Sequence, residues 1–492
     1  MIHSVPQQPN SRTKPAALEP FPALPVAAIA VAVVVLLVSV AGRYGWHRDE
    51  LYFLAAGRHL AWGYVDQPPF TPMVARVADL VAPGNLYVLR ALPALATAGT
   101  VLLASLIARE IGGGRFAQIA AAATVAGGGF VLGVGHLLST AVFDLLAWML
   151  LLWIFCRLLR TADPRWWAAF GGVAGLALLN KNLVVLLALS LFAGLVVERR
   201  WSLLRTPWIL AGAAMALAVA SPNLVWQAHH GWVQVTMARA LAHRLGVVNR
   251  VTLVPFQVLF LGPALIWPLW SGARWLGRNP SAEPFRPLLW AWPAGVILAF
   301  VFAGRPYYIL PLTTLVMIAG LVASEHRDDR RVLVALLAIN AITSVPLALP
   351  LAPSSSLRTV PIATVNEAVA ETVGWPQLVD QTVRVVGTLA PSERAHLMLL
   401  TGSYGEAGAI DLFGPSQGLP PAYSPHNSYP YFRQPHDDAA TVVAIRLPVG
   451  WLNHWFARCT QVGTVHNGLH VTNEVQGQPI VICNGLRGDW SS

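Results

Sequence analysis

Long apolar runs alternate with short polar breaks over the first 350 residues of the chain. An α-helix needs about 20 apolar residues to cross a bilayer, and most of the runs approach that length. The pattern therefore predicts an α-helical polytopic membrane protein, with residues 24–350 as its transmembrane part and residues 43–85 as the first loop. Eleven transmembrane helices are expected, at residues 24–42, 86–108, 116–135, 141–159, 166–180, 183–198, 207–226, 251–271, 287–303, 307–323 and 332–350.

The pattern changes after residue 350, where the chain becomes polar and starts with Pro- and Ser-rich sequence. Residues 351–492 are expected to form a small α/β domain, because short helical and strand patterns alternate there. The expected helices lie near 361–373, 376–389 and 449–459, with one more from Glu406, and the expected strands lie at 396–401, 441–447, 461–472 and 479–483.

Basic residues concentrate in the short loops on one side of the predicted helices, which is typical of cytosolic loops. No small-residue cleavage site follows the first apolar run, so we interpret this run as a retained helix rather than a signal peptide. With residues 1–23 as a cytosolic tail, eleven crossings place residues 351–492 on the outer face. The sequence predicts a multi-pass protein of the bacterial plasma membrane with an extracytoplasmic C-terminal domain.

Charge is scarce and unevenly distributed. Only 11% of the residues are charged, against roughly 25% in a typical soluble domain. The net charge of +10 comes from arginines in the predicted cytosolic loops, so we expect no nucleic-acid partner. No acidic residue has to lie at the middle of the bilayer, which argues against an ion-coupled transporter. The chain has no phosphate-binding loop and no HExxH or CxxC pattern, so we expect no cofactor and no metal site.

The first loop gathers ionisable and aromatic residues just outside the first predicted helix. It reads Trp-His-Arg-Asp-Glu-Leu-Tyr-Phe over residues 46–53, continues with Arg58 and His59, and reaches Gly-Tyr-Val-Asp-Gln-Pro-Pro over residues 63–69. An interfacial helix with snorkelling charges would explain any one of these residues. The whole cluster, in a chain with so little charge, predicts a chemical site on the outer face.

Five motifs in this order resemble those of the GT-C glycosyltransferases. The nearest resemblance is to glycosyltransferase family 39, whose relatives include the protein O-mannosyltransferases and the lipid A aminoarabinose transferases. The first motif is the loop just described, with its Asp-Glu pair and Pro-Pro element, and the resemblance covers about residues 30–325. The other four are Leu-Ser-Thr-Ala-Val-Phe-Asp at 138–144, Gly-Leu-Ala-Leu-Leu-Asn-Lys at 175–181, Ser-Pro-Asn-Leu-Val-Trp-Gln at 221–227 with His-Gly-Trp at 230–232, and Arg-Pro-Tyr-Tyr at 305–308.

The resemblance implies transfer of a sugar, with inversion, from a polyprenyl-phosphate carrier to an envelope glycan, lipid or protein on the outer face. Such a reaction needs a base for the acceptor hydroxyl and cations for the phosphate leaving group. It implies Asp49 as the general base, Glu50 as a residue that orients the loop or the acceptor, and Asp144 as a second acid near the acceptor. The implied contacts to the donor phosphate or the substrate are Arg58, His59, Asp66, Gln67, Lys181, Arg305 and Tyr307.

Parts of this assignment stay open. Better-known relatives carry a lysine where this chain has Gln67, so the donor phosphate would depend more on Arg58, Lys181 or Arg305. Asp144 is either the second acid or a helix-end carboxylate without a role. Lys181 is either a phosphate contact or an interfacial anchor for its helix.

Two further expectations concern carboxylates of the first loop. A carboxylate partly removed from water holds its proton more tightly, so we expect Asp49 to be a better base than an exposed Asp. Asp79 lies in the same loop but outside every motif, so we expect it to be dispensable.

The C-terminal region adds two expectations. Cys459 and Cys483 should form a disulfide, because the predicted topology places them in an oxidising compartment. Polar, aromatic and turn-forming residues gather at 401–408 and 424–429, where they would suit carbohydrate contact or form two structured loops.

Two other classes of function compete with the glycosyltransferase. A transporter or flippase of lipid-linked sugars predicts intramembrane charges or inverted repeats, and the sequence shows neither. A non-enzymatic envelope protein that binds polysaccharide needs only one or two anchoring helices. The sequence therefore favours the transferase.

Overall fold

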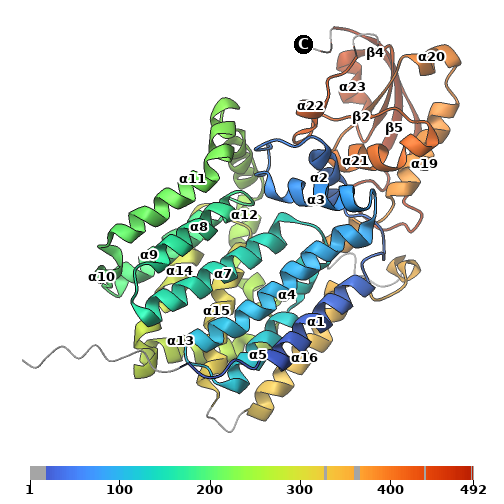
Figure 1. Ribbon diagram of the computed structural model, residues 1–492. Helices are drawn as coiled ribbons and strands as arrows, with labels where there is room; N and C mark the ends of the chain where they lie inside the picture. The colour runs from blue at the N-terminus through green and yellow to red at the C-terminus, as the bar shows by residue number, and fades with distance from the viewer. Residues whose placement is uncertain (1–17, 326–329, 359–365, 437–438, 489, 491–492) are drawn as a thin grey trace, which may run out of the picture.

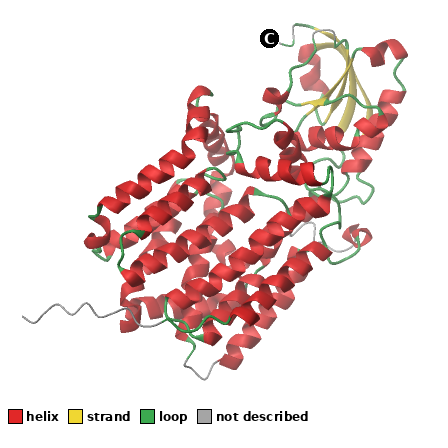
Figure 2. Cartoon of the chain, viewed as in Figure 1, coloured by secondary structure: helices red, strands yellow, loops and turns green. Residues whose placement is uncertain are grey.

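The computed structural model describes residues 18–325, 330–358, 366–436, 439–488 and 490, and consists of a helical bundle beside a small β-sheet (Figure 1, Figure 2). The helices of the bundle are α1 (Ala23–Ser39), α4 (Leu86–Glu110), α5 (Arg115–Ala126), α6 (Gly129–His136), α7 (Thr140–Thr161), α8 (Trp166–Leu178), α9 (Val184–Val197), α10 (Trp201–Leu204), α11 (Pro207–His229), α12 (Val233–Leu261), α13 (Ile266–Arg278), α14 (Arg286–Val301), α15 (Leu310–Ala323) and α16 (Arg330–Ala348).

The bundle is built from helices that are apolar enough for a membrane. Within the described part of the chain, seven helices are long and apolar enough to cross a bilayer, and the bent pair α5–α6 would make an eighth. Three shorter apolar helices, α1, α8 and α9, coincide with predicted runs. A polytopic helical membrane protein is therefore confirmed, while the count of eleven crossings stays a prediction.

Two of the predicted runs differ from the helices that form. The run 116–135 is split near Gly127 into α5 and α6, which meet at an angle of 55°. The helix predicted at 251–271 has the wrong bounds, because α12 already starts at Val233 and ends at Leu261, before a break at Gly262. Charged residues such as Arg239 and Arg244 lower the average hydropathy of the first half of α12, so an apolar window misses it.

Small residues let some of these helices touch through their backbones. Gly272 of α13 and Gly320 of α15 face each other, and a Cβ on either would overlap a backbone carbonyl of the other helix, at Val316 and Pro268 respectively. Close approach at small residues is typical of helix pairs in membranes, where lipid offers no hydrophobic drive for association.

The first loop folds into two helices that lie between the bundle and the sheet (Figure 1). They are α2 (Arg48–Arg58) and α3 (Phe70–Val81). His47 begins α2 with a capping box, in which its ring nitrogen accepts from the Asp49 N–H and the Glu50 carboxylate accepts from the His47 N–H. This cap fixes where the Asp-Glu pair sits, because the first turn of a helix needs acceptors for its free N–H groups.

The C-terminal part, described from residue 366 onward and here called the C-terminal unit, surrounds a five-stranded sheet of order β2-β1-β3-β5-β4. Strand β1 runs parallel to β2 and β3, whereas β5 is antiparallel to β3 and β4. Every residue of the central strand β3 is buried, as expected for a strand covered on both faces. The elements are α18 (Glu367–Ala370), α19 (Trp375–Gly387), α20 (Pro391–Ala395), β1 (Leu397–Thr401), α21 (Tyr404–Phe413), β2 (Ala422–Tyr423), α22 (Tyr429–Phe432), β3 (Thr441–Ile445), α23 (Val449–Trp455), β4 (Phe456–Thr464) and β5 (Pro479–Leu486).

Most predicted elements of this unit form near their expected positions, with three errors. The strand expected at 461–472 overlaps only the end of β4, and residues 465–472 form no strand. The helix expected at 449–459 stops at Trp455, and its last residues belong to strand β4. Residues 361–365 of the helix expected at 361–373 lie outside the described residues, and the rest contains only the short α18. The domain boundary at residue 351 stays a prediction.

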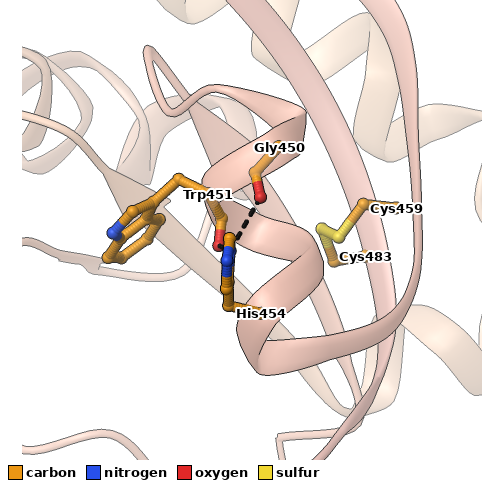
Figure 3. The surroundings of a disulfide bond; sticks show 5 residues. All are labelled: Gly450, Trp451, His454, Cys459 and Cys483. Atoms are coloured by element: carbon orange, nitrogen blue, oxygen red, sulfur yellow. Dashed lines mark hydrogen bonds between the residues drawn. A yellow bond between two sulfur atoms is a disulfide. The ribbon is translucent and has the colours of Figure 1, made fainter.

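The expected disulfide is present in the structure. Cys459 of β4 lies opposite Cys483 of β5 in the antiparallel pair, and their sulfur atoms are bonded (Figure 3). The bond crosses two neighbouring strands next to α23, in which His454 donates to the Gly450 carbonyl over 2.9 Å. The only free cysteine among the described residues is the buried Cys156.

We expect replacement of both disulfide cysteines by serine to lower the free energy of unfolding of the C-terminal unit by about 3 kcal/mol, because the bond closes a loop of 24 residues. Thermal unfolding of the double variant in detergent measures the loss of stability. Mass spectrometry of the unreduced natural protein shows whether the disulfide forms. Free thiols in the natural protein would contradict the assignment.

Candidate active site

One cleft joins the bundle to the C-terminal unit. It encloses about 1380 Å³ of empty space, part of it open to solvent, and is lined by six segments of the chain before residue 310 together with Tyr404 and Asn427. Those segments are α2 with Asp49, Tyr52 and Phe53, the loop at 66–68, Thr140 at the start of α7, the connection between α8 and α9 with the start of α9, the first half of α12, and residues 302–308. Of the ten residues expected at a site, Asp49, Asp66, Gln67, Lys181 and Arg305 line this cleft.

Asp49 lies in the first turn of α2 with its carboxylate at the cleft. Its Oδ1 accepts a hydrogen bond of 2.7 Å from the hydroxyl of Tyr404, and the Arg48 Nε lies 3.6 Å from the same oxygen. The side chain is 36% exposed, so the carboxylate remains accessible from the cleft.

The protonation of Asp49 differs from the sequence-based expectation. Enclosure in the cleft by itself raises the pKa of this carboxyl, but His47, Arg48 and the hydrogen bond from Tyr404 outweigh it and hold the pKa below its ordinary value. The expected rise in proton affinity is therefore wrong, because nearby positive charge and a donated hydrogen bond stabilise the carboxylate form. Asp49 is ionised at neutral pH and is free to accept a proton.

Glu50 does not reach the cleft. Its side chain is fully buried, and its carboxylate accepts from the Arg90 Nη2 over 2.8 Å and from the Leu138 N–H over 3.0 Å. Arg90 of α4 is 1% exposed and also donates to the carbonyls of Ala41 and Gly45. Glu50 therefore connects α2 to the end of α1 and to α4 through Arg90. This agrees with the expectation that Glu50 orients the loop, and it removes Glu50 from the expected catalytic residues.

We expect Glu50→Gln to lower stability by about 3–5 kcal/mol, because it leaves the Arg90 charge buried without its partner. The melting temperature in detergent measures this effect, and Glu50→Gln combined with Arg90→Gln should recover part of the loss. A single variant that melts like the natural protein would show that this ion pair is not a structural support.

Asp66 and Gln67 line the cleft on the side of the first loop. The hydroxyl of Tyr52 donates to the Asp66 Oδ1 over 2.6 Å. Burial raises the pKa of the Asp66 carboxyl to about 6, although the Tyr52 hydrogen bond opposes the rise. The Gln67 side chain is 4% exposed, and its Nε2 has no hydrogen-bond partner among the described residues. Gln67 thus keeps a free donor where a relative's lysine would place a cation.

Lys181 projects from the connection between α8 and α9. Its Nζ donates to the Tyr307 hydroxyl over 3.2 Å and lies 4.9 Å from the centre of the Tyr308 ring. The connection is fixed by Asn180, which donates to the Thr140 carbonyl at the start of α7. The Lys181 ammonium is therefore held at the cleft by aromatic groups, and no carboxylate of the described residues is bonded to it.

Asp144 and Arg305 are two further charged residues of the expected site. Asp144 of α7 is 7% exposed, does not line the cleft, and its Oδ1 has no partner among the described residues. It is an electrostatic neighbour of Lys181. The Arg305 side chain is exposed and makes no hydrogen bond or ion pair with the described residues, while its charge acts on Asp49. The cleft thus contains two cations that are not neutralised by a bonded carboxylate.

Both the sequence and the fold of the chain resemble those of known proteins. Residues 66–226 match the family described as dolichyl-phosphate-mannose-protein mannosyltransferase. No curated protein matches the sequence significantly.

Two kinds of solved structure resemble the whole chain. ArnT from Cupriavidus metallidurans, bound to undecaprenyl phosphate, has a TM-score of 0.61 at 17% identity, over 93% of this chain and 98% of ArnT. Its apo form has a TM-score of 0.60 at 16% identity, over 94% and 98% of the two chains. The arabinofuranosyltransferase AftD from Mycobacteria has a TM-score of 0.52 at 14% identity, over 94% of this chain and 40% of AftD.

The family match indicates a glycosyltransferase, and the whole chain has the fold of ArnT. The family match indicates an enzyme, and so decides against the transporter and against the polysaccharide-binding protein. The fold match extends over nearly the full length and includes the C-terminal unit of the glycosyltransferase.

Three of the expected phosphate or substrate contacts of this glycosyltransferase do not line its cleft: Arg58, His59 and Tyr307. Tyr307 adjoins the cleft through its hydrogen bond with Lys181. The Arg58 Nε is paired with the Asp79 carboxylate at 3.1 Å, and the His59 ring stacks on Phe432 at 4.8 Å between centroids. Both line a separate cavity with Trp226. Arg58 and His59 are therefore removed from the expected phosphate contacts, because Arg58 is already paired with a carboxylate and His59 is already stacked on an aromatic ring.

The contacts of Asp79 contradict the expectation that this residue is dispensable. Its side chain is 7% exposed, it pairs with Arg58 and with Arg76, and it accepts from the Gly84 N–H. Spacing along the loop hides these contacts, because Arg58 and Asp79 belong to different helices.

Several residues of the cleft are absent from the sequence-based assignment. Tyr404 and Asn427 reach it from the C-terminal unit. The clusters at 401–408 and 424–429 signalled this part of the chain, and the first is not a loop but the end of β1 and the start of α21. One face of α12 also lines the cleft, through Gln234, Met237, Ala238, Leu241, Ala242, Leu245 and Asn249.

Proposed function

We propose that the enzyme transfers a sugar from a polyprenyl-phosphate carrier to a hydroxyl of an envelope glycan, lipid or protein, with inversion at the anomeric carbon. The observation that carries the proposal is that Asp49, Lys181 and Arg305, from three distant parts of the chain, line one cleft. A base and two cations are what displacement of a phosphate by a hydroxyl requires.

The proposed step begins with the acceptor hydroxyl at Asp49. The carboxylate takes the hydroxyl proton while the oxygen attacks the anomeric carbon, and the bond from that carbon to the phosphate oxygen breaks. The polyprenyl phosphate leaves with the bonding electrons, and the ammonium of Lys181 and the guanidinium of Arg305 stabilise its added negative charge. The step uses no cofactor.

The apolar residues along α12 support a lipid-linked donor. Met237, Leu241 and Leu245 extend from the cleft along one face of the helix, so an isoprenoid chain could leave the charged part along an apolar path. ArnT, which shares the fold, was solved with undecaprenyl phosphate bound, and this supports the same class of carrier here.

Other residues of the cleft have supporting roles in this proposal. Tyr307 and Tyr308 hold the Lys181 ammonium, and Asp144 helps to keep it charged and oriented. Asp66 and Gln67 contact the donor sugar or its phosphate from the first loop. We also propose that the cleft and the C-terminal unit face the outside of a bacterial plasma membrane, in agreement with the disulfide.

A deletion strain and a detergent assay test the proposed function together. Lipid analysis of the deletion strain should show one polyprenyl-phosphate sugar accumulating while that sugar disappears from the envelope glycans. The purified enzyme, added to a detergent extract of ¹⁴C-glucose-labelled membranes from this strain, should move label from the lipid fraction to an acceptor.

Detergent separates the transferase from a transporter, because micelles have no second compartment. Label transfer that occurs only in sealed vesicles, and never in detergent, would overturn the proposal. An unchanged content of polyprenyl-phosphate sugars in the deletion strain would also contradict it.

A further inference from the structure

The C-terminal unit packs directly on the helix that carries Asp49. Helix α21 lies against α2, as Figure 1 shows, and the two backbones approach closely where Gly408 meets Leu51. A Cβ at Gly408 would lie 2.8 Å from the Leu51 Cβ, so a larger residue has no room there. This contact fixes the start of α21 relative to the first turn of α2.

The first residue of α21 is Tyr404, and its surroundings fix the direction of its side chain. Ser403 caps the helix through a hydrogen bond from the Gly405 N–H. The Tyr404 ring lies 5.0 Å from the Tyr52 ring and 5.0 Å from the His426 ring, measured between centroids. The hydroxyl is thereby directed at the carboxylate of α2.

An ion pair crosses the same interface, and two more within the C-terminal unit support it. Arg48, next to the base, is paired with Glu474 of the C-terminal unit. Arg446 pairs with Glu474 at 3.1 Å and with the fully buried Glu406 at 3.2 Å. The interface therefore has both a close backbone contact and a charged network, and Tyr404 lies between them.

We propose that Tyr404 is a positioning residue of the active site, whose hydroxyl holds the Asp49 carboxylate in one orientation and in its ionised form. The proposal rests on the proposed function of Asp49 as the base. The Tyr404 hydroxyl donates to the Asp49 Oδ1 over 2.7 Å, which leaves Oδ2 for the acceptor hydroxyl. The His47 Nδ1 lies 4.0 Å from this Oδ2. The bundle carries the base, and the C-terminal unit completes the site by orienting it.

The charge on Asp49 has several other sources, and these decide how large the effect can be. Burial and the Asp49 charge raise the pKa of the Tyr404 hydroxyl, so it remains a donor across the range of an assay. His47, Arg48 and Arg305 also face Asp49 and stabilise its charge, whereas Asp66 opposes it. Loss of the hydroxyl should therefore weaken the preference for the carboxylate without abolishing it.

The test is Tyr404→Phe, which removes the hydroxyl and keeps the ring contacts. Label transfer in the detergent assay is measured as initial rates from pH 3 to pH 8, so that the acid limb set by Asp49 lies within reach. Because the hydrogen bond lowers the pKa of Asp49, we expect the acid limb of kcat/KM to move to higher pH by about one unit, with a several-fold loss of kcat at neutral pH. Tyr423→Phe, in β2 and away from the cleft, is the matched control and should leave the pH profile unchanged.

A second variant tests the hydrogen bond in the opposite direction. Tyr404→3-fluorotyrosine keeps the hydroxyl, makes it a stronger donor, and should retain the rate while the acid limb stays or moves to lower pH. It also keeps the inference testable if Tyr404→Phe weakens folding, which melting curves would show.

The outcomes separate this inference from the proposed function. A Tyr404→Phe enzyme that is slower but has the natural pH profile would mean that Tyr404 only supports the structure, and would overturn the inference. If Asp49→Asn transfers label normally, the base assignment itself fails. If Asp49→Asn is inactive while Tyr404→Phe behaves as the natural enzyme, only the inference fails.

Discussion

Asp49→Asn should lower the turnover of label transfer by about 10²–10⁴-fold, while the protein still inserts and folds. The amide keeps the shape of the side chain but cannot accept the acceptor proton. Since the pKa of Asp49 is held below its ordinary value, the natural carboxylate is ionised throughout the neutral range, and the loss should be equally large from pH 6 to pH 8. The detergent assay and complementation of the deletion strain measure it.

The matched control for this variant is Asp380→Asn, an exposed carboxylate of α19 far from the cleft, which should be silent. Asp79→Asn cannot serve, because it removes the charge of a buried carboxylate that pairs with Arg58. Membrane levels of each variant are compared in parallel. Normal complementation by Asp49→Asn would remove the general base from the mechanism and most of the case for this cleft.

Lys181→Gln should reduce transfer by roughly 30- to 10³-fold, since one charged contact in a site sheltered from water contributes about 2–4 kcal/mol to the transition state. The loss should appear mainly in kcat, because the phosphate gains charge as the bond breaks. Arg305→Gln should act in the same direction, with a smaller effect because its side chain is exposed. Initial rates at saturating lipid donor separate kcat from KM.

Arg458→Gln is the control for both cation variants, because this exposed arginine of β4 lies outside the cleft. Since Gln67 is uncharged, Gln67→Lys combined with Lys181→Gln should recover part of the lost rate. Normal rates for both single cation variants would show that the leaving phosphate binds elsewhere.

The sequence by itself determined the class of the protein and much of its outline. Apolar runs produce the helices of the bundle because a bilayer selects on hydropathy summed over one segment, and that sum is local. Most elements of the C-terminal unit follow from local periodicity for the same reason. The disulfide could be anticipated because only two of the three cysteines, Cys459 and Cys483, lie outside the apolar runs.

Local pattern also located the chemistry without distinguishing its parts. The acid pair at 49–50 marked the site, yet only the structure separates Asp49 at the cleft from Glu50 in its buried pair with Arg90. Two neighbouring residues of a helix point in different directions, and what each meets depends on elements far along the chain. For the same reason, the structure pairs Arg58 with Asp79 instead of placing it at the expected phosphate site.

Only the tertiary structure decided which residues share the cleft. Tyr404 is 355 positions from Asp49, and no period or spacing in the sequence connects them. The lowered pKa of Asp49 follows from that contact and from its charged neighbours, so burial alone gave the wrong sign. The first half of α12 was missed because its charged, exposed face masks the apolar face that lines the cleft. Sequence pattern reports the average over a segment, whereas the site is made by the one face of each segment that the fold turns inward.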